Sequence, residues 1–175
     1  MLDFRVFGMP RSGTTWAANW LTTDRSICWH DPIQSMTPAE IDARGSQAEY
    51  RGISCTGSWL FADWAHRHPA RTLILERDPL ECNASLRALG LPEMTAEMIE
   101  AFMALPGWRV PWSHLFDHDA AERIWDYLLP DIPFCPERHA LLCGMAVQPD
   151  FITQTPDASR LRRVIDELQR SQVWG

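Results

Sequence analysis

The stretch FRVFGMPRSGTTW, residues 4–16, joins a strand pattern, a glycine-containing turn and the start of a helix. Residues 4–8 are mostly apolar and are predicted to form a strand, and residues 13–22 are predicted to form the helix. A turn in this position aims successive backbone N–H groups into one concavity, and the helix N-terminus adds partial positive charge there. The stretch therefore predicts an anion-binding loop in an α/β fold.

Short apolar runs alternate with amphipathic segments along the rest of the chain. This alternation is typical of an α/β fold, so we expect a central, mostly parallel sheet of roughly four to five strands flanked by helices. The whole chain, residues 1–175, is interpreted as one domain. Further strands are predicted at residues 26–30, 51–55, 72–76 and 109–112, and further helices at 38–48, 58–68, 95–104, 137–145 and 158–171 and just after residues 78 and 119.

The composition is that of a soluble globular protein, with 46% hydrophobic and 22% charged residues. No apolar run approaches the roughly 20 residues of a membrane span. The first residues, MLDFRVFG, lack the basic and apolar regions of a signal peptide. We therefore expect a cytoplasmic protein with no membrane partner.

The charge of the chain narrows the choice of ligand. The formal net charge is −7, which disfavours nonspecific binding of nucleic acid. The chain contains no lysine, so a positive pocket for an anionic ligand has to be built from arginine. The five cysteines form no CxxC pair, which argues against a zinc site or a disulfide framework.

Residues 8–16, GMPRSGTTW, overlap the spacing of a nucleoside-triphosphate loop, GxxxxGK[ST]. The lysine of that pattern, which reaches the β- and γ-phosphates, is replaced here by Thr14, and the basic residue lies inside the loop at Arg11. Binding and hydrolysis of ATP or GTP is therefore the weaker interpretation of the loop.

The segment PRSGTTW resembles the 5'-phosphosulfate loop of the PAPS-dependent sulfotransferases. The resemblance implies a P-loop sulfotransferase-like fold and PAPS as cofactor, with PAP as product and no metal. It also implies roles for individual residues. Arg11 and Ser12 would hold the 5'-phosphosulfate, Gly13, Thr14 and Thr15 would bind phosphate through amides and hydroxyls, and Trp16 would lie against the adenine.

A second segment, LILERDPLECNAS at residues 73–85, carries Arg77 directly after a buried strand. A cation at the start of a helix is unfavourable, which points to a functional role for Arg77. Asp78 is predicted as the N-cap of that helix and Glu81 as its capping-box partner. The segment resembles the 3'-phosphate site of the same family, where a serine follows the arginine by eight residues, as Ser85 does here.

The catalytic base is where the chain departs from the family. Many members carry a lysine followed by a histidine or a proline at the end of a strand, and the corresponding residues 54–57 are Ser-Cys-Thr-Gly. We predict His30 as the base, because a histidine titrates near neutral pH, with Asp31 orienting it or acting in its place. Arg11 would then take over the stabilisation of the leaving group.

The sequence thus predicts transfer of a sulfonate from PAPS to a hydroxyl or an amine. The expected partner is a small-molecule, glycan or peptide acceptor, and self-association into a homo-oligomer stays open. Two alternatives remain: a nucleotide-binding protein of the same fold that has lost catalysis, and a P-loop nucleotide kinase or NTPase.

Overall fold

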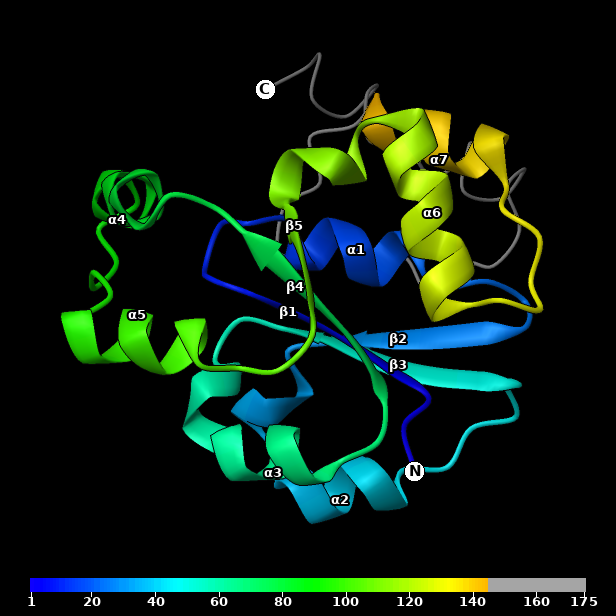
Figure 1. The fold of residues 1–175 in the computed structure, drawn as a ribbon, viewed down its shortest axis with the longest axis horizontal. Helices are drawn as coiled ribbons and strands as arrows, with labels where there is room; N and C mark the ends of the chain where they lie inside the picture. Colours follow the sequence, from blue (N-terminus) through cyan, green and yellow to red (C-terminus); the bar gives the residue numbers. More distant parts are fainter. Residues whose placement is uncertain (145–175) are drawn as a thin grey trace, which may run out of the picture.

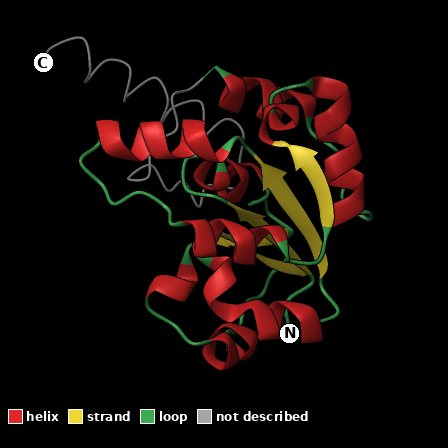
Figure 2. Ribbon diagram, turned by 60° about the vertical axis from the view of Figure 1, so that its left-hand side comes forward, coloured by secondary structure: helices red, strands yellow, loops and turns green. Residues whose placement is uncertain are grey.

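In the computed structural model, residues 1–144 are described, and they form a parallel sheet between two layers of helices (Figures 1 and 2). The strand order is β2-β3-β1-β4-β5, and each neighbouring pair is parallel. The predicted α/β fold with a parallel sheet is confirmed. The strands are β1 (Phe4–Gly8), β2 (Ser26–His30), β3 (Tyr50–Cys55), β4 (Arg71–Glu76) and β5 (Trp108–Pro111).

The helices cover both faces of the sheet and enclose two apolar cores. Figure 1 shows α1 (Thr14–Trp20), α6 (His118–Leu128) and α7 (Pro136–Cys143) on one face, with α2 (Pro38–Ala43) and α3 (Ala62–Arg67) on the other. The second core also takes side chains from α4 (Pro79–Ala88) and α5 (Ala96–Met103). A parallel sheet needs this cover, because both of its faces are apolar.

The central strand, β1, shows how alternate residues serve the two cores. Phe4 and Val6 belong to the core under α1 and α6, whereas Phe7 belongs to the opposite core. Arg5 is also buried in this strand, where its guanidinium donates to Thr72 Oγ1 and to the carbonyl of Ala65. Main-chain and hydroxyl oxygens therefore compensate for the burial of this charge.

Several helix boundaries differ from the predictions. The helix predicted at 38–48 ends at Ala43, and the one predicted at 58–68 begins as the 3-10 helix η2 (Ser58–Phe61). Leu60, which lies in this 3-10 helix, is 69% exposed. Asp117, not Asp119, caps α6 by accepting from the amide of Ala120. The helix predicted at 158–171 lies outside the described residues.

Long-range hydrogen bonds fasten α1 to α7. The indole Nε1 of Trp16 donates to the carbonyl of Leu142 over 3.0 Å, and Arg138 Nε donates to the carbonyl of Trp20 over 3.2 Å. Arg138 thereby satisfies a carbonyl at the end of α1 that has no partner within the helix. Residues 1–144 include no helix that is long and apolar enough to cross a membrane.

Candidate functional site

The carboxyl ends of all five strands meet at one cleft of about 610 Å³. The loop that follows β1 lies at its centre, and each of the other strands delivers a lining residue at its end or directly after it. Ligands of open parallel sheets bind at the carboxyl ends of the strands, at the point where the connections from two adjacent strands run in opposite directions. The residues delivered by the other strands are His30 and Asp31 (β2), Thr56 (β3), Arg77 (β4) and Trp112 (β5).

The loop between β1 and α1 is wound tightly. Arg11 and Gly13 have left-handed backbone angles, with φ of 69° and 87°. A Cβ at Gly8 would lie 2.4 Å from Ser12 Oγ, so only glycine leaves room for the loop to fold back. The Ser12 hydroxyl is fully buried and donates to the carbonyl of Met9. Ser12, predicted to bind the cofactor, therefore closes the loop from beneath and does not line the cleft.

The end of this loop offers free donors to the cleft. Gly13, Thr14 and Thr15 all line it, and their backbone amides have no hydrogen-bond acceptor among residues 1–144. The first amide of α1 that is paired belongs to Ala17, which donates to the carbonyl of Gly13. Unpaired amides that converge beside two threonine hydroxyls are suited to the oxygens of a phosphate.

Two arginines from distant parts of the sequence flank these donors. Arg11 and Arg77 both line the cleft, and Arg77 Nη1 donates to the main-chain carbonyl of Arg11. The guanidinium of Arg77 also lies 4.6 Å from the ring centre of Trp112, which holds it by a cation–π contact. Ser85 does not line the cleft, but its hydroxyl accepts from Arg11 Nε over 3.2 Å. The predicted 5'- and 3'-phosphate elements are therefore adjacent.

Two carboxylates, those of Asp78 and Glu81, offset the unfavourable position of the Arg77 cation at the start of α4. Asp78 caps the helix as predicted, since its carboxylate accepts from the amide of Leu80 over 2.8 Å. The predicted capping box is not formed, because the Glu81 carboxylate accepts from Arg77 Nε over 3.2 Å instead. Glu81 is 60% exposed, so this ion pair is screened by water and leaves Arg77 available to an anion in the cleft.

His30 lies beside the hydroxyls of Thr14 and Thr15. Its Nε2 is 3.1 Å from Thr15 Oγ1, 3.5 Å from Thr14 Oγ1 and 3.4 Å from Asp31 Oδ2. Burial lowers the pKa of His30 below its ordinary value, and the carboxylate of Asp31 offsets part of this effect. His30 is therefore neutral at physiological pH, which is the state a general base requires.

Asp31 is held in a strained conformation by its neighbours. Its φ is 43°, in the left-handed region that residues other than glycine rarely adopt. The carboxylate accepts from the amide of Thr56 over 2.6 Å, from the Thr56 hydroxyl over 3.0 Å and from Gln34 Nε2 over 3.3 Å. The two non-glycine residues with positive φ in residues 1–144, Arg11 and Asp31, both line this cleft, as is common for functional sites.

Trp16 is placed mostly in the core. It is 3% exposed, and its ring packs against Trp20 and Phe116 at centroid distances of 5.3 and 5.1 Å. The indole borders the cleft but is already anchored to Leu142. The predicted contact with an adenine stays a prediction.

Part of the lining was not predicted from the sequence. Thr56 and Trp112 each follow a strand directly, so the rule that ligands bind at the carboxyl ends of parallel strands was a signal that could have found them. The remaining missed residues carry no such signal, because only the packing of the 3-10 helix η1 (Pro32–Gln34), of α4 with the turn after it, and of the segment after β5 brings them to the cleft. They are Gln34, Leu86, Leu89, Leu91 and Phe116.

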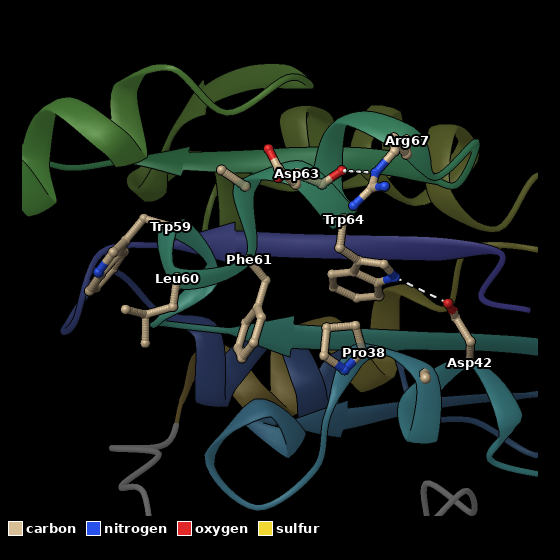
Figure 3. Close-up of a pocket in the computed structure, with 10 residues that line it drawn as sticks. Pro38, Asp42, Trp59, Leu60, Phe61, Asp63, Trp64 and Arg67 are labelled. Carbon is tan, nitrogen blue, oxygen red and sulfur yellow. Dashed lines mark hydrogen bonds between the residues drawn. The ribbon is translucent and has the colours of Figure 1, made fainter.

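A second cleft of similar volume lies between α2 and the segment formed by η2 and α3 (Figure 3). Two pairs of its polar groups bond to each other: Trp64 Nε1 donates to Asp42 Oδ2 over 3.1 Å, and Arg67 Nε donates to the carbonyl of Asp63 over 3.1 Å, whereas the buried Trp59 Nε1 has no acceptor among residues 1–144. None of the residues predicted from the sequence lines it. The cleft at the strand ends is therefore the better candidate.

No protein-family model matches the chain, and a search among curated proteins found no match. Across residues 1–144, no three histidine, cysteine or acidic side chains gather in a way that would hold a metal ion. The geometry of the cleft is therefore the basis for a proposed function.

Proposed function

We propose that the protein transfers a sulfonate group from PAPS to a hydroxyl or an amine of an acceptor. One observation carries the proposal: Arg11 and Arg77, 66 residues apart in the chain, line one cleft together with the unpaired amides of residues 13–15. A nucleotide with phosphates at both its 5'- and 3'-ends needs two separate cationic contacts, and these residues supply them.

The lining is suited to the size and polarity of such a ligand. A cleft of about 610 Å³ is within the range of small-molecule and cofactor sites, roughly 300–1,000 Å³. Arg11 and the free amides come from the loop after β1 and Arg77 comes from the turn after β4, whereas Leu86, Leu89 and Leu91 offer apolar surface from α4 and the turn after it. The arginines and amides are suited to the phosphates of a nucleotide, and the leucines are suited to its base.

PAPS supplies a sulfonate joined to its 5'-phosphate through a bridging oxygen. His30 accepts the proton that the acceptor hydroxyl or amine loses as the new bond to sulfur forms. Arg11 stabilises the bridging oxygen, which keeps the electron pair of the broken S–O bond. Asp31, 3.4 Å from His30 Nε2, stabilises the imidazolium that results.

A nucleotide-binding protein without transferase activity is the second candidate. It is favoured by the end of β3, where the family's lysine and histidine are absent. The residues there have structural roles: Ser54 Oγ donates to the carbonyl of Thr14 over 2.7 Å, and Thr56 holds Asp31. A nucleotide kinase or NTPase is less favoured, because Thr14 occupies the position of the phosphate-binding lysine.

Isothermal titration calorimetry with PAP tests the binding step. We expect PAP to bind more tightly than 5'-AMP and than ATP with magnesium, because only PAP satisfies both arginines. Arg11→Ala and Arg77→Ala should each weaken PAP binding, and Arg25→Ala, on an exposed ion pair with Glu49, is the matched control. An absence of heat with PAP under conditions where the chain is folded would refute the proposal.

Transfer of radiolabelled sulfonate from PAPS to a panel of phenols, alcohols and amines tests catalysis. Turnover that is lost in His30→Ala while PAP binding is kept supports the transferase. Tight PAP binding without turnover on any acceptor supports the binding protein instead.

A further inference from the structure

The hydroxyl of Thr15 has two competing uses. In the structure Thr15 Oγ1 lies 3.1 Å from His30 Nε2, the shortest of the three polar contacts of that nitrogen. The same hydroxyl lines the cleft beside the unpaired amides of Gly13 and Thr14, where a phosphate oxygen would be bound. A hydroxyl has one hydrogen, so Thr15 can donate it to the imidazole or to the phosphate, but not to both.

We propose that Thr15 is a positioning residue that keeps the catalytic base blocked until the nucleotide is bound. Without ligand, Thr15 donates to His30 Nε2 and occupies the lone pair that would take the acceptor proton. When a phosphate takes the Thr15 hydrogen, Nε2 is released toward the acceptor. This inference rests on the proposed function, and it predicts that nucleotide binding precedes activation of the acceptor.

The surroundings of His30 agree with Thr15 as the donor. The oxygens of Asp31 accept from Thr56 and Gln34 at 2.6–3.3 Å, closer than its 3.4 Å separation from Nε2. Asp31 is therefore committed mainly to other donors, and Nε2 is left to accept from Thr15. Three residues contact His30 Nε2: Asp31 next to it in the chain, and Thr14 and Thr15 of α1. Ser54 is its neighbour on β3. The further polar or charged residues that line the same cleft are Arg11, Thr56 and Arg77.

The two states of Thr15 differ in the proton affinity of His30. A hydrogen bond donated to Nε2 stabilises the neutral imidazole, so releasing it raises the pKa of His30. The charge of the bound phosphate acts in the same direction. By linkage, PAP then binds more tightly below the pKa of His30 than above it.

Nitrogen-15 NMR of the imidazoles in the full chain tests this, with His30→Gln to assign the signal. In the free protein Nε2 should show the shift of an unprotonated ring nitrogen, and PAP should raise the His30 pKa by about 1 or more. In Thr15→Val the pKa of the free protein should already be raised, and the further rise caused by PAP should be smaller. Thr15→Ser keeps the hydroxyl and should retain the rise in the His30 pKa that PAP causes, and the exposed Ser46→Ala is the control that should leave the His30 pKa unchanged.

The measurements distinguish a failure of the role of Thr15 from a failure of the proposed function. If calorimetry detects PAP binding but Thr15→Val shows the wild-type change in the His30 pKa, the role of Thr15 is disproved and the proposed function stands. The same holds if Nε2 carries the proton in the free protein. If PAP does not bind the folded wild type, both the proposed function and this inference fall.

Discussion

The guanidinium of Arg77 donates a hydrogen bond to the main-chain carbonyl of Arg11. This contact joins the turn after β4 to the loop after β1, which are neighbouring strands in the sheet. The same guanidinium lies over the ring of Trp112, which follows β5. One side chain thus links the ends of three strands.

Arg77→Ala should weaken PAP binding about 10- to 100-fold, because hydrogen bonds to charged groups contribute about 1.5–3 kcal/mol each. The loss should be much smaller for 5'-AMP, which lacks the 3'-phosphate. Arg77→Lys keeps the charge but not the planar fork, so it should fall between wild type and alanine. The control is Arg87→Ala in α4, because Arg87 does not line the cleft and its side chain is engaged in an exposed ion pair with Glu93. Equal losses for PAP and 5'-AMP would contradict the assignment of Arg77 to the 3'-phosphate.

Gly13→Ala should destabilise the fold by about 1–2 kcal/mol, the cost of placing an ordinary residue in the left-handed region. Its φ is 87°, and an added Cβ would also press against Leu115 at 3.1 Å. Urea denaturation followed by tryptophan fluorescence measures the change. Gly90→Ala has a similar φ of 68° with open space around it, so it should show the backbone cost alone. Gly45→Ala, with no such strain and open space, should be neutral or slightly stabilising.

Thr72→Val should cost about 1–3 kcal/mol of unfolding free energy, because it leaves a buried charge with unpaired donors. Thr72 Oγ1 accepts from both Nε and Nη2 of Arg5, at 3.1 and 2.9 Å. Burial lowers the pKa of Arg5 to about 10, so the guanidinium is still charged at neutral pH. Thr72→Ser restores the hydroxyl and should recover most of the loss. Equal stability of the valine and serine variants would show that the hydroxyl is dispensable.

His30 should make the fold less stable in acid. Its pKa in the folded state is lowered by burial, so the unfolded chain binds a proton more readily than the folded chain does. His30 therefore has no effect on stability well above pH 6.5, and the free energy of unfolding falls as the pH drops from about 6.5 through the folded-state pKa. Urea titrations across this range should show the loss in wild type and a smaller one in His30→Gln. His118→Gln, at an exposed histidine, should follow the wild-type curve.

The strands could be predicted because their signal is local. Residues 4–8, 26–30 and 72–76 are short apolar runs, and both faces of a parallel sheet demand such runs. The turn at 8–13 was also readable, since glycines at both ends are needed for its tight path. Helix ends were less predictable. The helix expected just after residue 119 begins at His118 and is capped by Asp117, and Glu81 pairs with Arg77 instead of forming the expected capping box.

The sequence by itself determined the alternation of strands and helices, and it predicted an anion-binding first loop whose cation has to be arginine. These follow from neighbouring residues and from composition. Only the tertiary structure decided that β1 lies between β3 and β4, which brings His30, Thr56, Arg77 and Trp112 to one edge. It also turned Trp16 into the core and placed Thr15 against His30. The physical reason is that such contacts join residues far apart in the chain. The distances between these residues depend on how the helices pack on both faces of the sheet.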